Sequence, residues 1–201
     1  MRKRSTKTAT TRTRLLDTAG QLFRCQGFHA TGLDEVLKRS GTPKGSLYHY
    51  FPGGKDQLAI ETLGHFVAQL EQQMSALLSS SSDPLKALRK FLLFSVKSLA
   101  ESDFRDGCPI AAVTLDVASD RESIREACEA GFQTWLKVFV RHLRGAGLSE
   151  TRAKSIATLF LASLEGGMIL SRAQRSVAPL KAIANELVLV IQASLAAGTR
   201  Q

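Results

Sequence analysis

The segment "SGTPKGSLYHYF", residues 40–51, constrains the fold more than any other part of the chain. Within it, Gly41 suits a helix C-terminus, Thr42 is a good N-cap, and Pro43 suits the first position of a new helix. Large apolar and aromatic side chains follow directly. We therefore expect one helix to stop at Gly41 and a two-turn helix to run from Pro43 to about Tyr50.

Two further helices are predicted before this turn. From about Thr11, apolar residues recur at helical spacing until Gly27 ends the pattern. Thr31 then stands three residues before Asp34, which resembles a capping box and predicts the start of a short second helix.

The third helix is too short to be stable alone, because isolated helices need roughly 12–15 residues. Leu47 and Phe51 are therefore expected to anchor it in a core. A helix, a tight glycine turn and a second short helix form the helix-turn-helix pattern, in which the second helix enters the major groove of DNA.

Positive charge is concentrated in the same part of the chain. The net charge is +9 over 201 residues, and residues 1–60 contain 11 Lys and Arg but only 4 Asp and Glu. This asymmetry indicates a polyanion-binding module on a nearly neutral body. The tail at 1–10 lacks apolar periodicity and should be mobile. Its Arg2, Lys3, Arg4 and Lys7 either contact phosphates or the minor groove, or form a disordered tail without function.

The rest of the chain predicts only helices, so the fold class is all-α. Strand alternation and hairpin signals are absent. A long helix begins at Lys55 and reaches the serine run at 79–83, and Asp83-Pro84 starts the next helix. A short apolar segment at 110–118 and three further helices follow, at about 121–144, 149–173 and 179–197. The last two have wide apolar faces, which fit either an intramolecular core or, as we favour, a homodimer interface.

Composition excludes several other classes of protein. Three scattered cysteines without a C-x-x-C pair indicate reduced thiols in the cytoplasm, and the histidines show no metal-ligand spacing. The basic N-terminus predicts no signal peptide, and no apolar run is long enough to predict a membrane span. A nucleotide loop would need G-x-x-x-x-G-K-[ST], but Lys55 is followed by Asp56. We therefore expect neither an enzyme nor a bound metal or cofactor.

The residues at about 12–63 closely resemble the DNA-binding region of TetR-family transcriptional repressors. The shared features are A-x-x-L-F-x-x-x-G-F, a Thr before the second helix, and G-T-P-K-G-S-L-Y-H-Y-F. The family usually has two residues between the Phe and the next Lys, whereas "FPGGK" has three. This insertion and the later "GCPIAA" are similar to the branch of LmrA-like and YxaF-like repressors, several of which control efflux or aromatic-compound genes.

The resemblance implies a two-part protein. A helix-turn-helix domain at 11–55 would bind a palindromic operator in double-stranded DNA, and a domain at 56–201 would form the homodimer and bind a small-molecule effector that releases the DNA. A ligand-independent helix-turn-helix protein stays open as an alternative, because an apolar core and an apolar pocket have the same sequence pattern.

Candidate DNA contacts follow from the motif and the resemblance. Thr31, with the free N–H groups after it, is expected to bind phosphate, and Lys55 matches the family's phosphate-binding lysine. His49 and Tyr50 match positions that reach the DNA backbone, or else they pack against the first helix. Four residues of the recognition helix are expected to contact bases and adjacent phosphates: Thr42, Lys44, Ser46 and Tyr48. Gly45 has no side chain and would let the helix lie close to the floor of the groove.

Candidate effector contacts rest on composition alone. Pockets are mostly apolar and aromatic, so we expect a hydrophobic or aromatic effector, although each residue could instead be plain core. The candidates lie on helices of the body or near segments expected to line a cavity: Phe91, Phe94, Cys108, Phe132, Trp135, Phe139 and Met168. Cys108 stands before Pro109 at a predicted helix start, which would favour the thiolate and leaves a redox sensor as a minor alternative.

Overall fold

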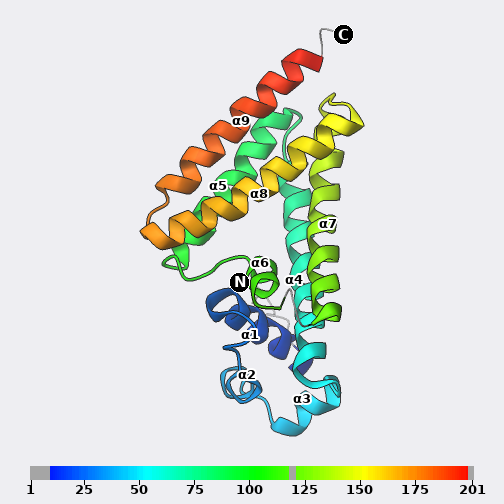
Figure 1. Cartoon of the computed structure of the whole chain (residues 1–201), viewed down its shortest axis with the longest axis vertical. Coiled ribbons are helices and arrows are strands. Elements are labelled where there is room, and N and C mark those ends of the chain that lie inside the picture. Colours follow the sequence, from blue (N-terminus) through cyan, green and yellow to red (C-terminus); the bar gives the residue numbers. More distant parts are fainter. Residues whose placement is uncertain (1–9, 118–120, 199–201) are drawn as a thin grey trace, which may run out of the picture.

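The computed structural model describes residues 10–117 and 121–198, and all regular structure in these two ranges is α-helical (Figure 1). The helices are α1 Thr11–Gln26, α2 Leu33–Ser40, α3 Lys44–Tyr50, α4 Gly54–Leu78, α5 Pro84–Glu101, α6 Pro109–Val117, α7 Glu122–Gly145, α8 Glu150–Gln174 and α9 Ala178–Gly198. The all-α prediction is confirmed. The predicted contacts of the tail, at Arg2, Lys3, Arg4 and Lys7, lie outside the described residues.

Helices α1, α2 and α3 form a small unit at one end of the molecule (Figure 1). Helix α2 ends at Gly41, whose φ of 63° is left-handed and therefore suits glycine, and α3 begins three residues later. Leu47 and Phe51 are fully buried in the common core, as expected. The two-turn α3 is thus held by tertiary packing rather than by its own helical propensity.

Two predicted helix caps are wrong. Helix α2 has Gly32 as its N-cap, and the Thr31 hydroxyl instead donates a 2.7 Å hydrogen bond to the Gly27 carbonyl. Helix α3 has Pro43 as its N-cap, one residue later than expected, and the Thr42 hydroxyl pairs with Ser40 at 2.7 Å. Both threonine side chains are buried, so each closes a turn inside the protein instead of capping the following helix.

Helix α4 connects this unit to the helices of the body. Its first half packs on α1, and it then runs along α7 and contacts α5 (Figure 1). In the body, α8 packs on α7 and α9, and α9 also covers α5. The Asp83 carboxylate accepts hydrogen bonds from the backbone N–H groups of Leu85 and Lys86, which confirms the predicted start of α5.

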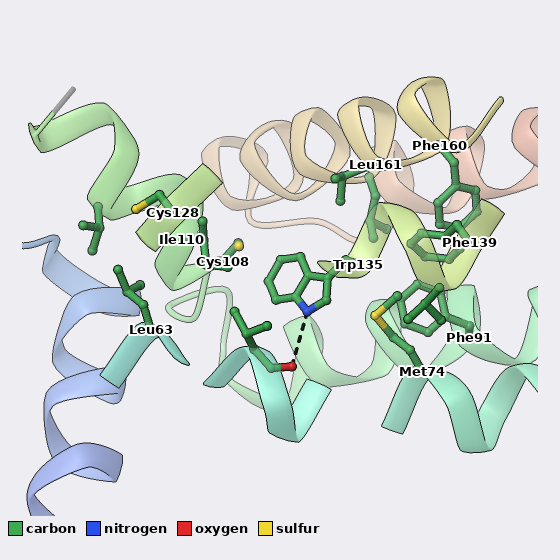
Figure 2. Packing of buried hydrophobic residues seen from close by; sticks show 14 of the residues in the cluster. Leu63, Met74, Phe91, Cys108, Ile110, Cys128, Trp135, Phe139, Phe160 and Leu161 are labelled. Carbon is green, nitrogen blue, oxygen red and sulfur yellow. Dashed lines mark hydrogen bonds between the residues drawn. The ribbon is translucent and has the colours of Figure 1, made fainter. Parts of the chain in front are cut away.

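The α7 backbone comes very close to α4 and α6 at Gly131. A β-carbon there would lie 2.7 Å from Ile110 of α6 and 2.9 Å from Val67 of α4, so only glycine fits without displacing a neighbour. Farther along α7, the Trp135 indole N–H donates a 3.5 Å hydrogen bond to the Val67 carbonyl (Figure 2). These contacts hold three helices in register beside the aromatic core.

Candidate DNA-binding surface and ligand cavity

Helix α3 presents a polar face to solvent. Lys44, Gly45 and His49 are exposed, Ser46 is half-buried, and Tyr48 exposes 48% of its surface. An exposed tyrosine beside a lysine on a helix buried only through Leu47 can reach a partner with both hydrogen-bonding and apolar groups. The structure therefore brings three of the four predicted base-reading residues, Lys44, Ser46 and Tyr48, to one surface.

Gly45 has no packing role within the chain, because a β-carbon at this position would meet no atom within 4 Å. Glycine inside a helix costs roughly 0.5–1 kcal/mol relative to alanine. Close packing inside the protein therefore does not explain this glycine, whereas close approach to an external surface would.

The other two aromatic candidates in the motif, His49 and Tyr50, make contacts within the protein. Tyr50 is half-buried and packs against the core, while His49 meets its ring edge-on at a centroid distance of 5.0 Å. Thr31 and Thr42 differ from the expectation more strongly, because both are buried and both hydroxyls already have partners within the chain. Their side chains are not placed to reach DNA in this conformation.

Lys55 lies at the start of α4, close to the loop between α1 and α2. Its Nζ lies 4.3 Å from the centroid of the Phe28 ring and donates to the His29 carbonyl at 3.4 Å. Burial, and then the nearby Arg121 guanidinium, lower the pKa of this lysine. The contacts with Phe28 and His29 hold the amino group of Lys55 at the start of α4.

One acidic group of the body, Asp116, holds the same loop. The Asp116 carboxylate, near the end of α6, accepts hydrogen bonds from the backbone N–H groups of Phe28 and His29 at 2.7 and 3.2 Å. Arg121, just before α7, forms a bidentate pair with Asp56 of α4 and also lies over the Phe28 ring. The ends of α6 and the start of α7 thus contact the unit that carries the recognition helix.

A cavity of about 150 Å³ lies inside the body, between α1, α4, α5, α7, α8 and the segment before α6. Six of the seven predicted effector residues line it: Phe91, Phe94, Cys108, Trp135, Phe139 and Met168. Phe132 does not line it, and its ring packs edge-on against Trp135. Figure 2 shows Trp135, Phe91 and Phe139 converging with Met74 and Leu161, which also line the cavity.

The cavity also has polar groups that the composition did not reveal. Arg24 and Asp106 line one side of it, with their side chains 3.7 Å apart, and Gln73 and Glu165 line other parts. Burial raises the pKa of Glu165 to about 7, and a hydrogen bond with Cys108 opposes the rise only in part. Amphipathic spacing places these residues on helices but does not show that they face a cavity. The sequence signal that could have identified Glu165 is a charged residue on an otherwise apolar face of α8.

The minor alternative of a Cys108 thiolate is not supported by the surroundings of this residue. Burial, and then the negative charge of Glu165, raise the pKa of this thiol well above its ordinary value. Cys108 precedes α6, and backbone N–H groups of Ala111 and Ile110 lower its pKa, but burial and then the acid beside it outweigh this effect. The environment therefore disfavours the reactive form that a redox sensor would need. All three cysteines are unpaired.

Within residues 10–117 and 121–198, no three His, Cys, Asp or Glu side chains gather closely enough to hold a metal ion. Two helices, α8 and α9, are long and apolar enough to cross a membrane by length and composition alone. The exposed apolar residues of these two helices belong to the wide apolar faces for which the sequence predicts a homodimer interface.

Comparison with known proteins agrees with this architecture. Residues 15–62 match the model of bacterial regulatory proteins of the TetR family, and residues 84–186 match the C-terminal domain of LmrA/YxaF-like transcriptional regulators. The HTH-type transcriptional regulator YxaF of Bacillus subtilis is 35% identical over 90% of this chain and 95% of its own. LmrA of the same species is 36% identical over 84% of this chain and 90% of its own.

Solved structures support the same conclusion. A TetR regulatory protein from Rhodobacter sphaeroides shares the fold with a TM-score of 0.82 at 23% identity, covering 90% of this chain and 98% of its own. The reduced form of Escherichia coli NemR has a TM-score of 0.76 at 25% identity, covering 89% of this chain and 95% of its own. These relatives are regulators rather than enzymes, and the chain belongs to the TetR family of transcriptional regulators, in its LmrA/YxaF-like branch.

Proposed function

We propose that the protein is a ligand-responsive repressor, which binds a palindromic operator as a homodimer and releases it when a small apolar or aromatic effector enters the cavity. One observation carries this proposal. Helix α4 begins beside Lys55 at the DNA-binding end and then lines the cavity with Phe66, Leu70 and Met74. A ligand that moves this helix would therefore also move a residue expected to bind phosphate.

In the proposed complex, α3 enters the major groove. Lys44 would bond guanine N7 or O6, and Tyr48 would pack on a thymine methyl. Ser46, His49 and Tyr50 would contact bases or the adjacent backbone, and Gly45 would let the helix lie close to the bases. Exposure of the α3 surface supports these assignments.

Phosphate contacts would position the protein on the duplex. Lys55 would donate to a phosphate from the start of α4. We assign Thr31 and Thr42 to a different role from the one first expected: their buried hydroxyls would keep the turns before α2 and α3 in the shape that DNA binding needs.

The homodimer would form through α8 and α9, at about 149–173 and 179–197. Large apolar side chains on these helices point outward, with Leu159 46% exposed and Leu189 54% exposed. A second copy would bury this surface, and a two-fold axis would match the symmetry of a palindromic operator. Leu159 and Leu189 are therefore the residues by which this interface can be tested.

The regulated genes would encode efflux or detoxification functions, and the protein would act in the cytoplasm, where the DNA lies. A ligand-independent repressor is the second candidate, and it would use the same DNA-binding surface. The lining of the cavity by five aromatic rings favours the ligand-responsive form.

The test is a titration of purified protein against labelled duplexes from the region upstream of its own gene and of neighbouring genes, followed by fluorescence anisotropy. Specific binding with steep salt dependence is expected, since counterions are released from each neutralised phosphate. A panel of apolar and aromatic compounds is then added to the complex. Binding to no duplex in that region would contradict repression by this surface, and specific binding that no compound reverses would favour the ligand-independent form.

A further inference from the structure

The carboxyl group of Glu165 is the polar group of the cavity that the protein leaves without a counter-ion. It lies on α8, in a wall otherwise made by apolar neighbours such as Leu161, Leu164 and Met168. Within residues 10–117 and 121–198, no lysine, arginine or histidine forms an ion pair with it. Its polar contact is the thiol of Cys108, which is a weak donor.

The other charged groups at the cavity do not fill this role. Arg24 faces Asp106 at 3.7 Å and also lies over the Phe66 ring, 5.7 Å from its centroid. Arg172 of α8 lies against Gly107, on the loop that carries Asp106. Asp106 offsets the charge of one of these two arginines, and neither arginine forms an ion pair with Glu165.

The remaining surface of the cavity is suited to one kind of ligand. Aromatic rings carry negative charge on their faces and attract cations within about 6 Å of the ring centroid. Phe66, Phe91, Phe94, Trp135 and Phe139 all line the cavity that Glu165 enters. A half-buried carboxylate without an ion-pair partner, in a cavity lined by aromatic rings, favours an ammonium or similar cation over a neutral or anionic molecule of the same shape.

We infer that the effector of this protein is a lipophilic organic cation, whose positive charge pairs with the carboxylate of Glu165 and whose apolar groups lie against the aromatic rings of the cavity. The inference rests on the proposed ligand response and specifies its chemistry. In the absence of ligand, burial keeps much of the Glu165 population protonated near neutral pH, since its pKa is raised to about 7. Binding of a cation would favour the ionised form and release a proton.

The test compares three probes of similar size: phenyltrimethylammonium, its neutral carbon analogue tert-butylbenzene, and the anion benzoate. Trp135 is the only tryptophan of the chain and lines the cavity, so its fluorescence reports binding directly. At pH 8 we expect the cation to bind at least about tenfold more tightly than the neutral analogue, in line with a charge pair strengthened by burial. Tighter binding of either other probe, or binding of none, would overturn the inference.

Two variants assign the effect to the carboxylate. Glu165→Gln should remove the preference for the cation while leaving the neutral analogue bound as before, and Glu165→Asp should keep part of the preference. Glu126→Gln removes the same charge from an exposed site on α7 and should change neither affinity. Helical circular dichroism confirms that each variant is folded. A cation preference that persists in Glu165→Gln would contradict the assignment.

pH provides an independent measurement. Affinity for phenyltrimethylammonium should fall about tenfold from pH 8 to pH 6, because only about a tenth of Glu165 would be ionised one pH unit below its pKa. Calorimetry near pH 6.5 in buffers of different ionisation enthalpy should detect the released proton. An affinity independent of pH would contradict the inference. It would leave the proposed repressor function standing, since operator binding and release are measured separately by anisotropy.

Discussion

The carboxylate of Asp116 accepts the backbone N–H of Phe28 at 2.7 Å, and this contact connects the end of α6 to the loop that precedes α2. The same carboxylate accepts from His29, whose ring nitrogen Nε2 donates to the Asp116 carbonyl at 3.0 Å. Because Cys108 lines the cavity directly before α6, this short helix has the cavity at one end and the DNA-binding unit at the other.

Asp116→Ala should therefore weaken operator binding without changing effector binding. Loss of two charge-assisted hydrogen bonds releases the loop, at a cost of about 1.4 kcal/mol, which is about tenfold in affinity. Anisotropy measures the operator affinity, and Trp135 fluorescence measures the ligand affinity. Asp103→Ala, which removes an exposed ion pair with Arg175, is the matched control and should leave both values unchanged. Equal behaviour of the two variants would argue against a coupling role for α6.

Lys44→Ala and Lys55→Ala should separate base reading from phosphate binding. Loss of Lys44 should reduce the preference for operator over random duplex by about 1–3 kcal/mol, because a base contact disappears. Loss of Lys55 should weaken binding to both duplexes and lower the slope of log affinity against log salt by about 0.9. Titrations at several salt concentrations measure both effects. An unchanged affinity and salt slope for every duplex in Lys55→Ala would refute the phosphate contact.

Leu159→Asp should convert the protein to a monomer, because it places a charge on the proposed dimer face. Sedimentation at micromolar concentration measures the mass. Leu115→Asp is the control, since Leu115 is 79% exposed on α6, away from α8 and α9, and should leave the dimer intact. A wild-type protein with monomeric mass, or a dimer that survives both Leu159→Asp and Leu189→Asp, would show that the interface lies elsewhere.

Glu165→Gln should change how stability depends on pH. A carboxyl whose pKa rises from 4.5 to about 7 on folding binds its proton more tightly in the native state, so its contribution is full below about pH 4.5 and declines as pH rises towards 7. Above pH 7 the variant should be more stable than wild type by up to ~3 kcal/mol, and near pH 4.5 the two should be alike. Urea unfolding at pH 5 and pH 8 measures the difference, and Glu126→Gln should show none. A constant difference at both pH values would contradict the burial of this acid.

Phe160→Ala should cost about 3–5 kcal/mol of unfolding free energy, because it opens a cavity in a packed aromatic cluster. The Phe160 ring lies 4.3 Å from the centroid of Phe139 and 6.1 Å from that of Phe91. Phe94→Ala should cost much less, since Phe94 is partly exposed at the cavity. Thermal unfolding followed by circular dichroism distinguishes the two, and similar losses would show that the cavity wall is as tightly packed as the core.

Local sequence signals predicted the helices well, since each depends on a short stretch of chain. Gly41 and the pair Asp83-Pro84 act through their own backbone geometry, so the structure has helix ends where these residues predict them. The roles of Thr31 and Thr42 were predicted wrongly because they depend on tertiary contacts rather than on local geometry. Their hydroxyls could cap a helix or close a turn, and only the tertiary fold, which buries both, decides between the two partners.

The cavity could be predicted only in part. Aromatic residues on the body helices pointed to it, but Phe132 has the same composition signal as Phe139 and lies outside it. The two residues differ in the direction that they face around the axis of α7, and the packing of α4 and α8 decides which direction faces the cavity. Glu165 and Arg24 could not be paired with the cavity from the sequence, because they lie about 140 residues apart and meet it only through the packing of α1 against the body.

The close approach at Gly131 has a mechanical consequence. The ends of the Val67 and Ile110 side chains lie directly against the α7 backbone at Gly131, where α7 has no side chain of its own between the helices. We therefore expect a displacement of α6 or α4 at the cavity to be passed directly to α7 at this contact. The contact at Gly131 would then be the pivot of the movement that the DNA-binding unit follows.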